Sequence, residues 1–238
     1  MKALNQFAKK RLDRLEKLLN HFPDESAKEE VHKIRLEIKK IKALLRLIHF
    51  NNKDFRDHKH YIHFRHIFRE TGEIRDRGLR QELVERYTQI ATPFYRSPDR
   101  AVQQFIKAIA GHRKTLGKQK KIILKEIGNV RAHTYSLYLH KKNKELNHFL
   151  MVGIKQRDLH ILRKLLKEII YLTSVKTKKN KIDSFLTESA ELIGNWHDKK
   201  VLIPWIRTHA PGEKETITHL QRECNSDLQA LRMLIKNR

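Results

Sequence analysis

Apolar residues recur along this chain every three or four positions, which is the spacing of one face of an α-helix. Alternating apolar and polar positions, which would predict β-strands, are few. Proline and glycine residues separate the periodic segments. The pattern therefore predicts an all-α protein, with helices over residues 2–20, 24–50, 53–71, 73–91, 99–115, 118–143, 145–175, 181–193, 198–208 and 213–236.

The segment from Val31 to Leu47 places two kinds of side chain on different faces of its helix. Isoleucine and leucine residues form one face, which predicts packing in a core. Five basic residues form the other, a stripe about 80° wide and some 20 Å long without interleaved acids. These residues, called the first basic row below, are His32, Arg35, Lys39, Lys42 and Arg46. Such a stripe can be an ordinary solvated face, but its order favours a binding site for a long anion.

The composition points to a polyanionic partner. The 238 residues include 52 Lys and Arg against 27 Asp and Glu, which gives a net charge of +25 and a pI of about 10.2. This excess favours nucleic acid, an anionic membrane or a phosphate polymer. The single cysteine, Cys224, excludes an internal disulfide framework. Neither a signal peptide nor an apolar run of about 18 residues is evident, so we expect a cytoplasmic protein without a membrane partner.

Two spaced motifs occur twice in the chain. His32-x-x-Arg35-x-x-x-Lys39 recurs 128 residues later, and the residues of the second copy, with one further lysine, form the second basic row. That row consists of His160, Arg163, Lys164 and Lys167. Some 40 residues after each copy comes a second echo, Gly72-Glu-Ile-Arg75-Asp76 and Gly194-Asn-Trp-His197-Asp198, offset by 122 residues.

The shared order of these motifs predicts two related helical halves. A break at Thr92-Pro93 and Ser97-Pro98 divides the chain into residues of about 1–95 and 99–238, with the motif helices at 31–47 and 158–172. With these two repeated motifs, the sequence resembles the CHAD family of histidine-containing α-helical domains over nearly its whole length. VHKIRLEIKKIKALLRLI resembles the basic helix of that family, and TGEIRDRGL resembles its Gly-x-x-Arg-Asp turn. The second half departs from the pattern at Glu168, Ile170 and His197.

The resemblance implies a single CHAD-like domain over residues 1–238, made of two four-helix bundles related by a pseudo-twofold axis. Both basic rows would then face a central groove or pore that binds inorganic polyphosphate, and the protein would associate with polyphosphate granules. In this interpretation the histidines are donors to phosphate, unless His32 and His160 are core histidines capped by backbone carbonyls. The pattern predicts no oligomeric state.

Further basic residues are expected to add to the anion-binding surface. They are Lys10, Arg14, Arg65, Arg69 and Arg75. The Arg75-Asp76 and His197-Asp198 pairs are also expected to fix turns by capping and local ion pairing. The run Lys118, Lys120, Lys121 and Lys125 indicates a general attraction to polyanions.

Two other functions stay open. Nucleic-acid binding agrees with the charge, but no known motif or aromatic platform accompanies the basic stripes. A metal-dependent phosphohydrolase would need an arrangement of acids and histidines that is not recognisable here, and no Gly-rich phosphate loop is present. His63, His66 and Glu70 share a helix face on which a Zn²⁺ site is conceivable, but the pattern strongly favours an ordinary polar helix surface. We therefore expect a non-enzymatic binding protein without a cofactor or a metal.

Overall fold

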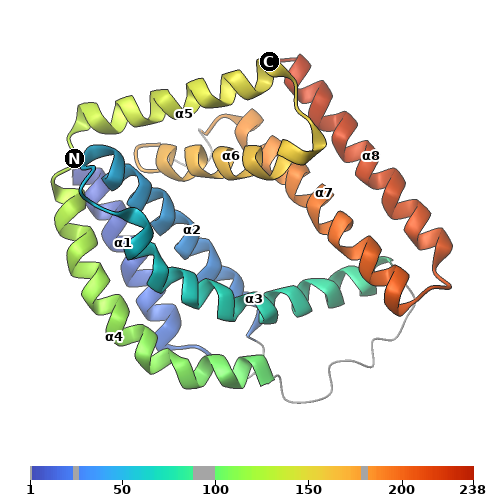
Figure 1. Ribbon diagram of the computed structural model, residues 1–238, viewed down its shortest axis with the longest axis horizontal. Coiled ribbons are helices and arrows are strands. Elements are labelled where there is room, and N and C mark those ends of the chain that lie inside the picture. Colours follow the sequence, from blue (N-terminus) through green and yellow to red (C-terminus); the bar gives the residue numbers. More distant parts are fainter. Residues whose placement is uncertain (1, 24–26, 88–99, 178–181) are drawn as a thin grey trace. The chain divides into compact units, whose positions relative to one another are not determined.

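The computed structural model describes residues 2–23, 27–87, 100–177 and 182–238. Within these ranges the protein is all-α, with eight α-helices, one short 3-10 helix and no strand (Figure 1). The elements are α1 (Lys2–Asn20), α2 (Lys28–Asn51), α3 (Asp57–Tyr87), α4 (Arg100–Gly128), α5 (Ala132–Val152), η2 (Gln156–Asp158), α6 (Leu159–Thr173), α7 (Ser184–His209) and α8 (Lys214–Lys236). The all-α prediction is confirmed for this part of the chain.

The helices form two compact units. Unit 1 contains α1, α2, α3 as far as Glu82, α4, and the start of α5 as far as Tyr138. Unit 2 contains the end of α3 from Leu83, the rest of α5 from Leu139, and α6, α7 and α8. Each unit carries one of the two basic rows, the first on α2 and the second on α6.

In unit 1, α1 packs against both α2 and α4 (Figure 1). Leucines of α1 and isoleucines of α2 are fully buried, among them Leu12, Leu15, Ile34 and Ile38. Burial of each such side chain stabilises the folded state by about 1.5–3 kcal/mol. The apolar face of α2 is thus held in the core, as its pattern predicts, and this fixes the direction in which its polar face points.

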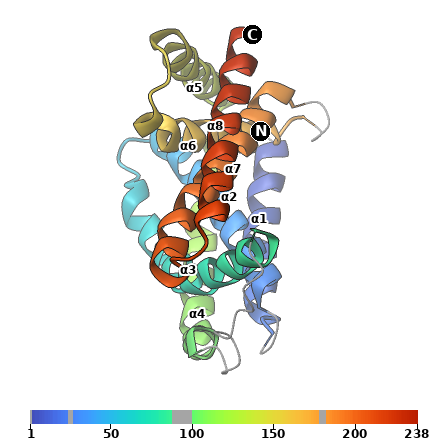
Figure 2. The same ribbon diagram turned by 90° about the vertical axis from the view of Figure 1, so that its right-hand side faces the viewer.

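Unit 2 is built on α7, which packs against α6 and also lies beside α8, as Figure 1 and Figure 2 both show. Leu162, Leu166 and Ile169 of α6 are buried with Phe185 and Ile193 of α7 in one apolar cluster. At the start of α7, the carboxylate of Asp183 accepts a hydrogen bond of 3.0 Å from the Phe185 amide, and this bond caps the helix.

Several predicted helix ends were wrong. Gly72 and Gly194 do not end helices, because α3 and α7 run through them, and the expected turns at Arg75-Asp76 and His197-Asp198 are helical. The break expected near residue 144 falls instead at residues 129–131 and 153–158, where Gly153 has a φ of 83°. A glycine inside a helix destabilises the fold by only about 0.5–1 kcal/mol relative to alanine, so a glycine by itself does not mark the end of a helix. The proline break at Pro93 and Pro98 lies outside the described residues.

The described helices contain no candidate transmembrane segment. None of the helices described here combines the length and the apolar character needed to cross a bilayer.

Candidate anion-binding site

The first basic row lies on α2, on the side opposite Glu37. Its residues include exposed His32 and Lys39, and the other three are half-buried. Glu37, opposite the row, is 1% exposed and accepts contacts from Arg11 at 3.3 Å and Lys40 at 2.9 Å. Lys33 contacts Glu29 at 2.7 Å and Glu30 at 3.3 Å, so the acids of α2 pair with cations outside the row, although the charge of Glu29 also acts on His32.

Two aromatic rings of α3 support the cations of the first basic row. The Arg35 guanidinium carbon lies 3.7 Å from the centroid of the Phe68 ring, and the Lys39 ammonium lies 5.9 Å from it. The Lys42 ammonium lies 4.2 Å from the centroid of the Tyr61 ring. Cation–π contacts of this kind contribute about 0.5–2 kcal/mol each, depending on desolvation. The rings thus hold extended cationic side chains in place without neutralising their charge.

Arg35 is the most constrained member of the row. Its Nη1 donates a hydrogen bond to the backbone carbonyl of Phe68. A Cβ atom added to Gly72 would lie 3.5 Å from the same Nη1, so the guanidinium rests directly on the α3 backbone. Tyr61, Phe68, Gly72 and Arg75 recur at helical spacing and therefore form the α3 face that meets the row.

The local electrostatics show that this surface is short of negative charge. The pKa of His32 is lowered by partial desolvation of its ring and then by the charges of Lys39, Arg75 and Arg35, with only a small opposing effect of Glu29. Burial, followed by the charge of Arg75, likewise lowers the pKa of Arg35. Asp76 acts in the opposite direction, and it pairs with Arg75 at 2.9 Å. An anion placed here would relieve the repulsion between these cations.

The second basic row lies on α6, in unit 2. His160 and Lys164 are exposed, whereas Arg163 and Lys167 are half-buried. The His160 and His197 rings lie 6.1 Å apart at their centroids. Partial desolvation and the charges of Lys164, His197 and Arg163 lower the pKa of His160, as cations do for His32. Glu168 is 5% exposed and so belongs to the buried side of α6.

Both units bring an arginine of the first motif against the glycine of the second motif. A Cβ atom added to Gly194 would lie 3.1 Å from Nη2 and 3.4 Å from Nε of Arg163. The Nε atom of Arg163 is buried, and it has no hydrogen-bond partner in the described part of the chain. The spaced sequence motifs therefore have one physical meaning in both units, which is close approach of a guanidinium to a glycine-bearing helix.

The further basic residues fall in different places. Arg65 and Arg75 lie near the first basic row. Burial raises the pKa of Tyr61 and the charge of Arg65 opposes this rise, whereas the charge of Arg75 adds to the lowering of the pKa of His32 that burial begins. Arg14 instead approaches Glu37, with 3.7 Å between Nε and Oε1, and Arg69 lines a hollow between α3 and α4. Lys10 is exposed on α1. The alternative that His32 and His160 are core histidines is wrong, because both are exposed.

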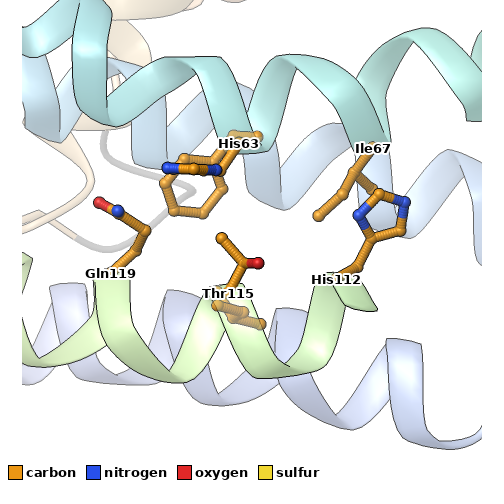
Figure 3. A pocket seen from close by; sticks show the side chains of 7 residues that line it. His63, Ile67, His112, Thr115 and Gln119 are labelled. Carbon is orange, nitrogen blue, oxygen red and sulfur yellow. The ribbon is translucent and has the colours of Figure 1, made fainter. Parts of the chain in front are cut away.

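His63 of α3 faces α4. A cavity of about 40 Å³ lies between these helices, and Figure 3 shows His63 and Ile67 across it from His112, Thr115 and Gln119. Glu70 is engaged by His112, with 2.6 Å between Oε2 and Nε2. In the part of the chain that the structure describes, no group of three or more His, Cys, Asp or Glu side chains is arranged to hold a metal ion. His63, His66 and Glu70 therefore do not form a metal site there.

Sequence reasoning missed Tyr61, Phe68 and the two glycines as supports of the basic rows. The signal was present, because Tyr61, Phe68 and Gly72 are spaced by seven and four residues and so share a helix face. Treating Gly72 as a helix end hid this periodicity.

Comparison of the chain with protein-family models, curated proteins and solved structures returned no match.

Proposed function

We propose that this protein binds inorganic polyphosphate along its basic rows, without catalysing a reaction. The first basic row carries the proposal. It holds up to five positive charges over 15 residues, or about 21 Å of helix, with no acid of α2 inside the stripe. A linear anion with closely spaced charges can follow such a row and meet a cation at every turn.

The side chains suit phosphate oxygens. Arginine offers a rigid fork of N–H donors for two oxygens, and lysine offers a mobile point charge. Arg35 donates a hydrogen bond from Nη1 to the Phe68 carbonyl, and this bond fixes the orientation of the guanidinium. In the proposal, the other N–H groups of the guanidinium bind the phosphate oxygens. Tyr61 supports Lys42 in a comparable way, with 4.2 Å between the ammonium and the centroid of the ring. The row thus presents donors whose positions are partly set before binding, which lowers the entropic cost of binding.

The resemblance to the CHAD family supports the same ligand and adds an architecture. On that basis the proposal includes two related helical bundles whose basic rows serve one groove, a cytoplasmic location and association with polyphosphate granules. These finer features rest on the quoted motifs, His32-x-x-Arg35 and His160-x-x-Arg163 with their later glycines.

Binding of single-stranded nucleic acid is the main alternative, and the aromatic residues argue against it. Bases bind to single-strand sites by stacking on exposed rings. Here the nearest rings, Phe68 and Tyr61, are covered by Arg35 and Lys42. A nucleic acid would therefore be held by its phosphates alone, whereas polyphosphate needs nothing else.

Calorimetric titration tests the proposal. Medium-chain polyphosphate and duplex DNA are titrated, at equal phosphate concentration, into the wild type and into a variant with Lys39→Gln, Lys42→Gln and Arg46→Gln. The control changes three exposed lysines of unit 2 to glutamine, Lys200, Lys214 and Lys236, and so removes the same charge. We expect tighter binding of polyphosphate than of DNA, and loss of this preference only in the row variant. Equal binding of both polymers, or an equal loss in the control, would contradict the proposal.

A further inference from the structure

Helix α4 carries a third line of cations that the repeat does not include. Its members, the α4 lysine row, are Lys107, Lys114, Lys118, Lys121 and Lys125. Their spacings of seven, four, three and four residues confine them to about 60° of the helix surface, over about 27 Å. All five are exposed, and none has an ion-pair or hydrogen-bond partner for its side chain among the described residues.

The acids near α4 are engaged elsewhere. Lys120 points away from the row and contacts Asp13 at 2.6 Å and Glu16 at 2.7 Å on α1. The one acid in the sequence of α4, Glu126, is half-buried and lies about 100° around the helix from the row. The lysines that sequence reasoning grouped as one run thus divide into a structural residue, Lys120, and three members of an unneutralised row.

The α4 lysine row and the first basic row occupy different surfaces of unit 1. The buried residues of α4, among them Phe105, Leu116 and Ile123, lie on the side opposite the lysines, where α4 meets α1. The first basic row instead faces the rings of Phe68 and Tyr61 on α3. A single short anion in contact with one row therefore does not contact the other.

We propose that the α4 lysine row is a second polyanion-binding surface, which takes a separate stretch of polyphosphate. The choice of ligand rests on the proposed function. The row consists of lysines, and no aromatic ring among the described residues supports them, so hydrated point charges would hold the ligand. A bilayer fits less well, because interfacial helices insert apolar side chains, and Ile122, at 38% exposed, is the only large exposed hydrophobic residue of α4.

Two surfaces on one unit have a consequence for assembly. A molecule that holds two stretches of polyphosphate cross-links chains or folds one long chain back on itself. Short chains would fill the surfaces independently, whereas long chains would join protein molecules into large particles. The α4 lysine row would then serve the organisation of polyphosphate, and the first basic row its recognition.

The experiment compares three charge-matched variants with the wild type. One changes Lys118, Lys121 and Lys125 to Gln in the α4 lysine row, the second carries Lys39→Gln, Lys42→Gln and Arg46→Gln, and the third is the control at Lys200, Lys214 and Lys236. Affinity for short-chain polyphosphate is measured by calorimetry against salt, and particle formation with long-chain polyphosphate by light scattering. Circular dichroism verifies that each variant remains helical.

The α4 variant should bind about half as many short polyphosphate chains per protein molecule at low salt, because the surface that has lost three charges releases fewer counterions and no longer holds a chain. It should also lose particle formation with long chains, while the control keeps both properties. If the α4 variant behaves like the control, the second surface is refuted. If the first-row variant behaves like the control while the α4 variant is impaired, the proposed function of the first row fails and the inference on α4 stands.

Discussion

The first and second basic rows begin with the same motif and differ in extent and support. The first row continues from His32 to Arg46 on a helix of 24 residues, whereas the second ends at Lys167 on a helix of 15. The residue four positions before the glycine is Phe68 in α3 and Ala190 in α7. Arg35 consequently lies on a ring, whereas Arg163 lies against Gly194 with its Nε buried and unpartnered among the described residues.

This difference teaches that a repeated motif can keep its geometry while its binding strength diverges. In both units a guanidinium approaches a glycine. In unit 1 aromatic rings also hold further cations of the row in position. The longer and better supported row should therefore contribute more to anion binding, and mutations can test that ranking directly.

The largest expected effect comes from removing charge from the first basic row. Replacing Lys39, Lys42 and Arg46 by Gln should weaken polyphosphate binding about 100-fold at low salt, if each partly exposed contact contributes about 1 kcal/mol. Replacing Lys164 and Lys167 by Gln in the second row should weaken binding by about 30-fold on the same basis. Calorimetry on both variants measures the difference, and equal losses would remove the proposed ranking.

The ring beneath Arg35 should have the next largest effect. Phe68→Leu keeps an apolar side chain and removes the π-system, so affinity should fall by about three- to tenfold, in line with the energy of a cation–π contact. A double-mutant cycle with Arg35→Gln isolates the pair, because the Phe68→Leu effect should vanish once the guanidinium is absent. An unchanged effect in the Arg35→Gln background would show that Phe68 acts through packing alone.

The two glycines should respond differently to alanine. Gly72→Ala should raise the free energy of unfolding by about 0.5–1 kcal/mol, because alanine favours a helix interior and its Cβ would lie at an ordinary 3.5 Å from Arg35. At Gly194 the Cβ would crowd Arg163 at 3.1 Å, so the same gain should be offset. Urea unfolding followed by circular dichroism measures both changes. Equal stabilisation at both sites would mean that Arg163 moves aside freely.

The all-α class, the apolar face of α2 and the two basic motifs could be predicted from the sequence, because each of them follows from the helical spacing of residues within one segment. The residues that support the rows could not be predicted in this way, because their role depends on which helix lies opposite each row. Phe68 and Gly194 became recognisable only when α3 and α7 were seen to run unbroken through their glycines. The separation of Lys120 from its neighbours also depended on tertiary structure, since its partners Asp13 and Glu16 lie more than 100 residues away in sequence.

The smallest expected effect is a pH dependence that distinguishes free from bound protein. The pKa values of His32 and His160 are lowered in the free protein, so the folded state binds fewer protons at these sites than the unfolded state. Stability from these sites should fall as the pH drops below the ordinary range of histidine, about 6.5. Bound polyphosphate should reverse the sign, because its negative charge favours the protonated rings, and affinity should rise over the same range.

The double variant His32→Gln and His160→Gln isolates this contribution from the other histidines. Calorimetry in buffers of different ionisation enthalpy counts the protons taken up on binding at about pH 6.5, where histidine titrates. The wild type should take up more protons than the variant, and its affinity should increase more steeply towards acidic pH. Equal proton uptake would place both rings away from the anion, and the basic rows would then act through arginine and lysine alone.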